Sequence, residues 1–499
     1  MNKLRQYGIS PKAVDTFIRK IKEHHVDLHS FSIYRKGQTV FSVYGYPFRK
    51  ESLHRMYSSG KMLAALAVLK AVDEGVLKFS DKVISFFYDE LPEDLDPKYE
   101  KLNVKHMLTM NTGHDYDTMM PMRESDNWIK GFFSQPLTVL PGTKFFYNGG
   151  VPYILTKIVQ KVTGQDYLDY LNEKFFDEMD VHIAADKTTQ GDTDPSGISI
   201  RICDFEKLAV LLLNQGKWNG KQLISSDIIN QMGKYHSSSI QSDSIQNVNL
   251  DTKYGYGYFL WRNSVGGYRL DGGRGQFGLV FPDLDMCVSI MASEEDQGLI
   301  PELFWECVYP FIWSDEAPEW TEIEELEEYK ALPEWNTIHN DLSEVDDCTY
   351  KFPENTLGID QVHFSVDDGV IRADFVQNGK SISVYAGADG RERINEEMVE
   401  LPEPNWFMNH VTGNTDHNYY VVGRYIIAPD FMGNKEITLY IRSMDKTAYD
   451  IFSFRIANKA IRLEWAHGAW NCIKMRGRLE ILPHIPSPVM VLGSKMEQE

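Results

Sequence analysis

The pattern of apolar and polar positions changes its period several times along the chain, and each change predicts a different element. Apolar residues recur at helical spacing within residues 1–25, which predicts an amphipathic helix. The segments "SFSIYRKG" and "QTVFSVYGY" follow and predict an antiparallel hairpin that turns at Lys36 and Gly37. Residues 62–72 are apolar except for Lys70, which predicts a buried helix.

Helical patterns dominate the next part of the chain, residues 80–235, where "VPYILTKIVQKVTG" is one clear example. A polar, serine-rich stretch over residues 235–253 predicts a loop. From Gly255 four short segments of strand character are joined by glycine-rich or Pro-Asp turns, and a last amphipathic helix ends near Trp313. Strands at both ends with helices between them predict one antiparallel sheet flanked by helices, with a helical lobe inserted.

The last third of the chain has a different character. An acidic stretch is interpreted as a linker or surface helix. Beyond Cys348 apolar and polar residues alternate, with turn signals at Asp367-Asp368-Gly369 and Asn378-Gly379, which predicts an all-β barrel or sandwich. The predicted organisation is an α/β (α+β) domain over residues 1–315, an acidic linker over 316–345 and an all-β domain over 346–499.

Composition and net charge limit which kinds of molecule this protein is expected to bind. The chain has 499 residues, enough for two or three domains, and 42% hydrophobic with 25% charged residues is typical of a globular protein. The formal net charge of -21 argues against nucleic acid or an anionic membrane as a partner, because both require excess lysine and arginine. A small-molecule or peptide-like substrate, neutral or cationic, is therefore expected.

Cysteine and histidine usage predicts no metal and no cofactor. The five cysteines are scattered without a Cys-x-x-Cys pair, and we expect them to be reduced. His24, His25 and His29 lack metal-ligand spacing and are expected at the surface or at a strand end. No apolar segment reaches the length of a membrane span, and we expect a cytoplasmic protein. The oligomeric state is left open.

Ser58 and Lys61 form a Ser-x-x-Lys pair directly before the buried helix. Residues three apart on a helix share a face, so a lysine amine can meet a serine hydroxyl and make it nucleophilic. The alternative is a helix-capping serine with a lysine that reaches solvent. A second pair, Ser443 and Lys446, lies between two alternating segments and is interpreted as a hairpin turn.

Two further motifs follow in order. The segment "PGTKFFYNGG" presents Tyr147 just before a helix, and "YRLDGGRGQFG" presents a glycine-rich bend at the end of a strand. A Ser-x-x-Lys pair, a Tyr-x-Asn-like loop and a glycine-containing triplet in this order resemble the serine β-lactamase and penicillin-binding-protein superfamily. The resemblance is closest to its class C β-lactamase-like esterases and amidases, and it covers about residues 5–313.

The resemblance implies a role for each motif. Ser58 would be the acylated nucleophile and Lys61 the base that takes its proton. Tyr147 would relay a proton to the leaving group and later help to activate water. The backbone N–H groups of Ser58 and Gly273 would form the oxyanion hole, where glycine permits close backbone approach.

The tyrosine motif departs from the superfamily pattern. Gly149 stands at the third position of Tyr-x-Asn, while Asn148 occupies the middle. The amide that would contact Lys61 and the substrate is therefore absent or displaced. Alternatively, Asn148 and Gly149 are a turn pair that begins the following helix.

The strand triplet departs as well. Leu270, Asp271 and Gly272 stand where a Lys-Thr-Gly triplet is usual. Lysine and threonine would bind a substrate carboxylate there, whereas leucine cannot and the aspartate would repel it. Arg274 would restore some positive charge. These residues argue against penicillins as substrates.

Three functions remain open at this point. The first is a serine hydrolase that cleaves an ester or amide through an acyl-enzyme on Ser58. The second is a β-lactamase or D-Ala-D-Ala peptidase, which Asp271 and the missing export signal disfavour. The third is a catalytically silent binding protein of the same fold, which Gly149 supports. The role of the all-β domain is left open.

Overall fold

The computed structural model places most of the chain. It describes residues 2–24, 26–46, 48–240, 250–294, 296, 298–317, 341–355, 358–377, 379–388, 393–395, 399–400, 418–419, 421–429, 435–443, 450–457, 460–467 and 489–495.

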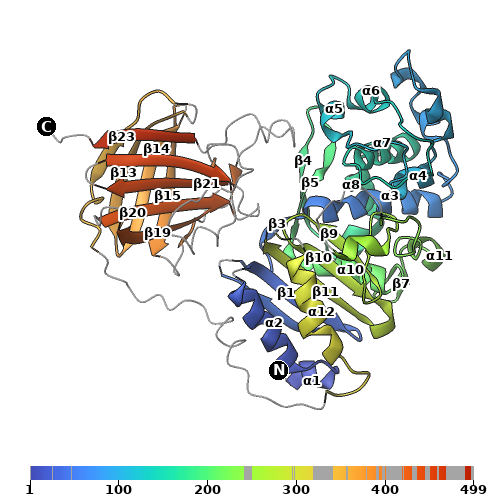
Figure 1. The fold of residues 1–499 in the computed structure, drawn as a ribbon, viewed down its shortest axis with the longest axis horizontal. Helices are drawn as coiled ribbons and strands as arrows, with labels where there is room; N and C mark the ends of the chain where they lie inside the picture. Colours follow the sequence, from blue (N-terminus) through green and yellow to red (C-terminus); the bar gives the residue numbers. More distant parts are fainter. Residues whose placement is uncertain are drawn as a thin grey trace.

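A six-stranded antiparallel sheet is the centre of the N-terminal part (Figure 1). The strand order is β2-β1-β11-β10-β9-β8, so the first hairpin pairs with the last strand of the region. Phe31 of β1 lies opposite Ile290 of β11. The prediction that both ends of this region build one sheet is therefore confirmed. The strands are β1 Asp27–Arg35, β2 Gln38–Tyr44, β8 Trp261–Arg262, β9 Tyr268–Gly272, β10 Gln276–Phe281 and β11 Met286–Ser293.

Helices cover both faces of this sheet. On one face α2 and α12 lie side by side and share a core with alternate residues of β1, β10 and β11, such as Phe31, Leu279 and Ile290 (Figure 1). On the other face α3, α7 and α10 pack in a second core with Leu270 and Val280. The helices are α1 Asn2–Gln6, α2 Pro11–Glu23, α3 Lys61–Asp73, α4 Val104–Leu108, α5 Met119–Arg123, α6 Trp128–Phe133, α7 Val151–Thr163, α8 Tyr167–Leu171, α9 Asp177–Met179, α10 Ile202–Leu213, α11 Ser226–Ile229 and α12 Leu299–Cys307.

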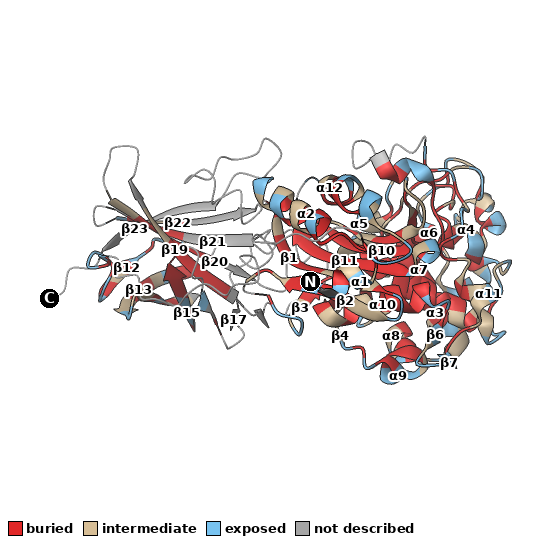
Figure 2. Cartoon of the chain, turned by 90° about the horizontal axis from the view of Figure 1, so that it is seen from below, coloured by how far each residue is buried: buried red, intermediate tan, exposed pale blue. Residues whose placement is uncertain are grey.

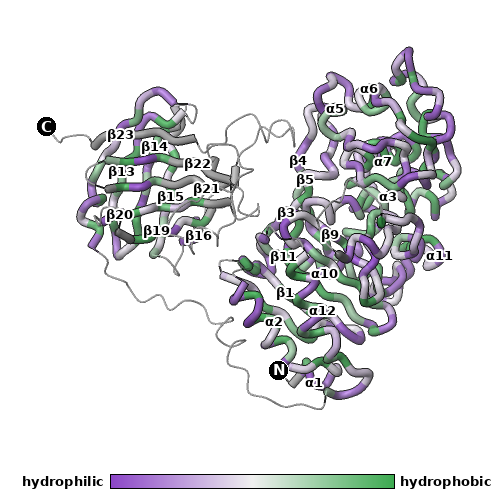
Figure 3. The backbone as a smooth tube through the Cα atoms, in the orientation of Figure 1, coloured by the Kyte–Doolittle hydropathy of each residue, from purple (hydrophilic) through white to green (hydrophobic). Residues whose placement is uncertain are grey.

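Apolar composition explains why α3 lies so deep. All but one of its first eleven residues are buried, Lys70 being the exception, and the helix contacts α7 and α8 in the core. In Figure 3 the tube through α3 and α10 is largely in the hydrophobic colour, and Figure 2 shows β10, β11 and α7 as mostly buried. Because apolar area buried from water stabilises the fold, α3 is a rigid element for the residues at its first turn.

Two expectations for the N-terminal part needed correction. The single helix predicted over residues 1–25 is divided into α1 and α2, because Gly8 adopts a positive φ of 73° and Ser10 caps α2 by accepting from Ala13 N. The region predicted as mainly helical also contains β4 (Ile183–Lys187) and β5 (Thr193–Arg201), which form a small sheet with β3 (Leu53–Arg55). This sheet was missed because its central strand β5 pairs with the distant β3, a contact that local patterns do not show.

The C-terminal part is an all-β barrel, as predicted. Its order is β15-β14-β13-β12-β23-β22-β21-β20-β19-β16, and a parallel pairing of β15 with β19 closes the sheet. The predicted turn at Asp368 and Gly369 joins β13 to β14, with φ of 46° and 75°. The strands are β12 Cys348–Lys351, β13 Ile359–Asp367, β14 Val370–Gln377, β15 Lys380–Ala388, β16 Arg393–Ile394, β19 Val421–Pro429, β20 Lys435–Ser443, β21 Asp450–Ala457, β22 Ala460–His467 and β23 Val489–Lys495.

Several expectations fall partly outside the described residues. Most of the acidic segment does, since residues 318–340 are not described, so the domain boundaries stay predictions. Lys446 and Cys472 also lie outside, although Ser443 ends β20. The described cysteines carry no disulfide. Within the described part of the chain, no helix combines the length and the apolar character that crossing a membrane requires.

Candidate active site

Ser58 lies in a tight turn that precedes α3. The turn is a 3-10 helix, Tyr57–Gly60, and Tyr57 adopts a positive φ of 50°. A left-handed conformation of an aromatic residue costs on the order of 1–3 kcal/mol and persists where surrounding structure enforces it. Ser59 is buried and its hydroxyl donates to the carbonyl of Met56 at 2.6 Å, whereas Ser58 is half-buried. Of the two adjacent serines, only Ser58 is therefore accessible.

The side chains of Ser58 and Lys61 meet. Lys61 Nζ lies 2.8 Å from Ser58 Oγ, and the lysine is only 7% exposed because it begins the buried helix α3. The N-cap of α3 is Gly60, without a side-chain hydrogen bond. Ser58 is thus not the capping serine of the alternative interpretation, and Lys61 does not extend into solvent. A hydroxyl and an amine at this distance can exchange a proton.

Tyr147 is the third residue of this group. The centroid of its ring lies 5.0 Å from Lys61 Nζ. Trp261 stacks on the ring at 5.6 Å, and Tyr256 stands perpendicular to it at 6.2 Å. This aromatic packing fixes the Tyr147 ring beside the lysine while leaving the residue half-buried.

The end of β9 lies directly against the Ser58 turn. A Cβ atom on Gly272 would lie 2.3 Å from the carbonyl oxygen of Met56 and 3.1 Å from Ser59 N, so only glycine fits there. The amide of Gln276 donates to the carbonyls of Gly273 at 3.2 Å and Ala292 at 2.8 Å. Gly273 is therefore held next to this contact, and its predicted part in an oxyanion hole stays a prediction.

Arg274 turns the chain from β9 into β10. It adopts a positive φ of 72°, and its carbonyl accepts from Glu294 N at 3.0 Å. The residue is half-buried. Its predicted role, added positive charge near the site, stays a prediction.

The loop after Tyr147 and the segment before α5 hold each other by hydrogen bonds in both directions. We call this hydrogen-bonded group the latch; it consists of Asp117, Thr118, Asn148, Gly149 and Gly150. Asn148 Oδ1 accepts from Thr118 N at 3.2 Å, Thr118 Oγ1 at 2.8 Å and Gly150 N at 3.0 Å. In return, Asp117 Oδ1 accepts from Gly149 N at 3.0 Å. A Cβ on Gly149 would lie 3.1 Å from Asp117 Oδ2 and a Cβ on Gly150 2.4 Å from Thr118 Oγ1.

The latch accounts for the departure in the tyrosine motif. Asn148 is fully buried and its carbonyl oxygen is occupied by three donors, so it holds the loop after Tyr147. Gly149 has no side chain because Asp117 fills the space where one would begin. The turn-pair interpretation of Asn148 and Gly149 describes this geometry. Their predicted contact with substrate stays a prediction.

The one charged side chain of the strand triplet, Asp271, is paired with an arginine on the same strand. Leu270 is fully buried and packs toward Gly278, while Asp271 Oδ2 accepts from Arg269 Nε at 2.8 Å. Burial raises the pKa of Asp271, and the Arg269 guanidinium opposes that rise. The sequence analysis missed Arg269, although residues two apart on a strand share a face and the spacing of Arg269 and Asp271 was visible.

The other missed residues gave weaker signals. Trp261 and Tyr256 flank Tyr147, and Asp117 and Thr118 hold its loop, yet all four lie far from it in sequence. Aromatic and short polar residues are common in cores and turns, so no spacing distinguished them. Only the packing of the lobe brings them to Tyr147.

No candidate metal site is present among the described residues, since no group of three or more histidine, cysteine or acidic side chains could hold an ion. His29 is fully buried rather than at the surface. Its Nδ1 lies 2.6 Å from His54 Nε2, and its ring stacks on Phe48.

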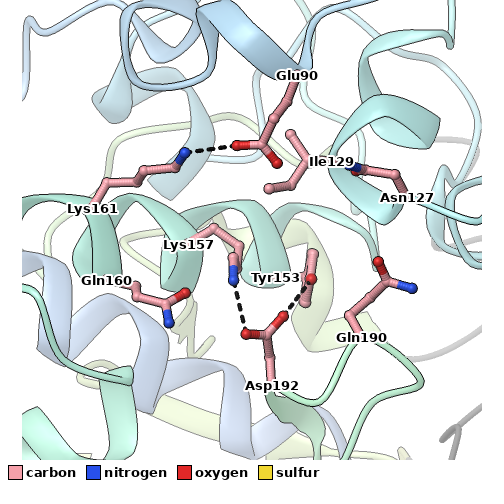
Figure 4. A pocket seen from close by; sticks show the side chains of 9 residues that line it. All are labelled: Glu90, Asn127, Ile129, Tyr153, Lys157, Gln160, Lys161, Gln190 and Asp192. Carbon is pink, nitrogen blue, oxygen red and sulfur yellow. Dashed lines mark hydrogen bonds and ion pairs between the residues drawn. The ribbon is translucent and has the colours of Figure 1, made fainter.

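A separate pocket of about 370 Å³ lies on α7 (Figure 4). Its charged groups are already paired, because Lys157 and Tyr153 both bind Asp192, at 2.8 and 2.9 Å, and Lys161 binds Glu90 at 2.7 Å. None of the predicted site residues lines it. The Ser58 group is therefore the candidate active site.

Comparisons with known proteins find several that are similar to parts of this chain. Lovastatin esterase of Penicillium rubens is 23% identical over 183 residues, which are 31% of this chain and 45% of that protein. Esterase EstB of Burkholderia gladioli is 26% identical over 155 residues, 28% of this chain and 39% of that protein. The chain thus spans less than half the length of either esterase. The crystal structure of a family VIII carboxylesterase has a TM-score of 0.48 and 16% identity, covering 61% of this chain and 98% of that one.

A match to a protein-family model shows to which family this chain belongs. The model described as Beta-lactamase matches residues 14–299, which is more than half of the chain and includes Ser58, Lys61, Tyr147 and the β9 strand. The superfamily resemblance stated from the three motifs is confirmed. This chain belongs to the beta-lactamase family.

Proposed function

We propose that this protein is a serine hydrolase that cleaves an ester or amide through an acyl-enzyme on Ser58. The observation that carries the proposal is the 2.8 Å contact between Lys61 Nζ and Ser58 Oγ at the start of a rigid, buried helix. An accessible serine beside an amine is the arrangement of an activated nucleophile.

The residues suggest the following steps. Lys61 takes the proton of Ser58 as the serine oxygen attacks the substrate carbonyl and forms a tetrahedral intermediate. The N–H groups of Ser58 and Gly273 stabilise the oxyanion. The intermediate collapses, the bond to the leaving group breaks, and Tyr147 donates a proton to that group and is reprotonated from Lys61. Water then attacks the acyl-enzyme, and its proton passes through Tyr147 to Lys61. When the second tetrahedral intermediate collapses, the bond between Ser58 and the acyl group breaks and Lys61 returns the proton to the Ser58 oxygen.

An ester is the proposed substrate class. Two relatives with matching segments are esterases by name, lovastatin esterase and EstB. The strand triplet offers no cation for a substrate carboxylate, because Leu270 is apolar and Asp271 is paired with Arg269, which disfavours penicillins and D-Ala-terminal peptides. The substrate is therefore proposed to be a neutral or cationic ester.

A fluorophosphonate probe tests the proposal by intact-protein and peptide mass spectrometry. We expect one covalent adduct on Ser58, because the probe phosphonylates an activated serine and loses fluoride. Ser58→Ala should show no adduct. Ser443→Ala is the matched control, since it removes the serine of the other Ser-x-x-Lys pair, and it should be labelled like the unmodified protein.

The same labelling experiment distinguishes a serine hydrolase from a catalytically silent binding protein of the same fold. A catalytically silent binding protein would show no adduct at Ser58 while remaining folded by circular dichroism. Labelling of a different serine, or equal labelling of Ser58→Ala, would also contradict the proposal.

A further inference from the structure

The nucleophile turn of the candidate active site is supported by strand β5. Met56 N, directly before this turn, donates to the carbonyl of Ile198 on β5 at 2.9 Å. The carbonyl oxygen of Pro195, also on β5, lies 3.4 Å from the place that a Cβ atom would take on Gly60. Because Gly60 belongs to the same turn as Ser58, β5 fixes where the nucleophile lies.

Tyr147 is supported by a different element, the helix α5. Asn148, the residue after the tyrosine, accepts from Thr118, and Thr118 is the N-cap of α5. Met122 N of this helix donates to the carbonyl of Thr118 at 3.0 Å. The helix has only five residues, so a shift of its last residue is passed directly to its start. The place of Tyr147 therefore depends on how the end of α5 is held.

A buried ion pair holds the end of α5 against β5. Arg123, the last residue of α5, donates from Nη2 to Asp194 Oδ2 of β5 at 2.9 Å, and the two side chains are 4% and 0% exposed. Asp194 Oδ1 accepts from Ser196 N at 2.8 Å, which orients the carboxylate on its strand. In Figure 1, α5 lies beyond the ends of β4 and β5. The pair thus joins the support of Tyr147 to the support of the nucleophile.

The guanidinium of Arg123 depends on this one carboxylate for its polar contacts. Its Cζ atom lies 5.0 Å from the centroid of the Trp128 ring, an apolar neighbour. Within the part of the chain that the structure describes, the buried atoms Nε and Nη1 of Arg123 have no hydrogen-bond partner. A buried charge that loses its counterion is strongly unfavourable. Asp194 therefore decides where the end of α5 lies.

We propose that Arg123 is a positioning residue, whose ion pair with Asp194 sets the place of Tyr147 relative to the nucleophile turn. The inference rests on the proposed function, since it concerns the proton that Tyr147 gives to the leaving group. A displacement of a reacting group by about 1 Å can lower a rate about a hundredfold, so a fixed link between the two supports matters for proton transfer.

Two butyrate esters test this, because their leaving groups differ in how much they need a proton donor. p-Nitrophenolate leaves without a proton, whereas the alkoxide of a benzyl ester requires one. The measured quantity is the ratio of kcat/KM for p-nitrophenyl butyrate to kcat/KM for benzyl butyrate, with the benzyl alcohol quantified by chromatography. General damage to the fold lowers both values and cancels in the ratio.

Arg123→Gln is the decisive variant, because it removes the ion pair. We expect its ratio to rise about tenfold, which is part of the rate that a general acid contributes. Tyr147→Phe removes the proton donor and should raise the ratio further. Arg123→Gln should add nothing in the Tyr147→Phe background, because the group that it positions is then absent.

A conservative variant and a control accompany these. Arg123→Lys should restore the ratio, because a single nitrogen of Arg123 contacts Asp194 and an ammonium can take its place; a lysine variant as impaired as Arg123→Gln would contradict the role of the ion pair. Arg201→Gln removes another ion pair of β5, from Arg201 Nε to Asp204 Oδ2 of α10 at 2.6 Å. That control should leave the ratio unchanged.

The outcomes separate the two proposals. If the ratio of Arg123→Gln stays within about twofold of the original one, or rises equally in the Tyr147→Phe background, the positioning inference is wrong and the hydrolase remains. Cleavage of p-nitrophenyl butyrate without any cleavage of benzyl butyrate also overturns it, since no proton then reaches a leaving group. If the unmodified protein cleaves neither ester and takes no probe, the proposed function itself fails.

A second variant covers the case in which Arg123→Gln does not fold. The double variant Arg123→Met with Asp194→Asn removes both charges of the pair, so neither is left buried without the other. The same rise in the ratio is expected, and an unchanged ratio there overturns the inference.

Discussion

The latch behind Tyr147 offers a quantitative test of how the active site is held together. Asn148→Ala removes the carbonyl oxygen that accepts from Thr118 N, Thr118 Oγ1 and Gly150 N. Asn148 and Thr118 are both fully buried, so no bulk water replaces the lost acceptor. The substitution therefore leaves two backbone N–H groups without a partner, while the threonine hydroxyl can rotate to another acceptor.

The expected loss of stability in Asn148→Ala follows from the number of donors that lose their acceptor. A buried donor left unsatisfied costs roughly 1–3 kcal/mol. Two such N–H groups sum to about 4 kcal/mol, while removal of Asn148 Nδ2, a buried donor that has no partner among the described residues, recovers about 2 kcal/mol. The expected net loss of stability for the N-terminal part is therefore about 2 kcal/mol. Asn103→Ala is the matched control, because Asn103 Oδ1 accepts only from His106 N at 2.9 Å as the cap of α4. Loss of such a cap typically costs about 1 kcal/mol.

Urea unfolding followed by tryptophan fluorescence compares the two variants. Hydrogen exchange measured on peptides that contain Thr118 and Gly150 localises the effect, since the freed amides should exchange faster in Asn148→Ala and not in Asn103→Ala. The rate of fluorophosphonate labelling at Ser58 should also fall more in Asn148→Ala, because Tyr147 directly precedes the latch. If Asn148→Ala is no less stable than Asn103→Ala, the latch does not hold this loop.

Three further predictions concern the base, the substrate and pH. Lys61→Arg should stay folded by circular dichroism yet abolish probe labelling, because arginine retains its proton; labelling near the original rate would make the lysine structural. Cleavage of p-nitrophenyl acetate should exceed that of nitrocefin in kcat/KM, since the triplet of Leu270, Asp271 and Gly272 offers no cation for the β-lactam carboxylate; equal turnover would refute this. Burial lowers the pKa of His114 to about 4. The unfolded chain, with an ordinary histidine pKa near 6.5, then binds the proton first, so stability falls with decreasing pH between about 6.5 and 4, by roughly 3 kcal/mol. Thermal unfolding of His114→Gln should lose that slope, and an unchanged slope would exclude His114 as its source.

The sequence by itself determined the elements that local pattern specifies. The apolar run of α3 predicted a buried helix, and alternation with Gly-containing turns predicted the hairpin of β1 and β2 and the strands β9, β10 and β11. These periods report which face of an element is buried. The order of three motifs also indicated the family, which the family model confirms.

Long-range packing decided the rest. The strand β5 pairs with β3, which lies over a hundred residues earlier, and β4 pairs only with β5, so this small sheet depends on a contact between distant parts of the chain. Asn148 was ambiguous in sequence between a substrate contact and a turn residue, and only the approach of Thr118 showed that its oxygen holds the loop. Asp271 looked like a free negative charge until Arg269 was found against it. In each case the meaning of a polar residue depends on which donor or charge the fold brings to it, because a buried polar group needs a partner and local sequence does not name that partner.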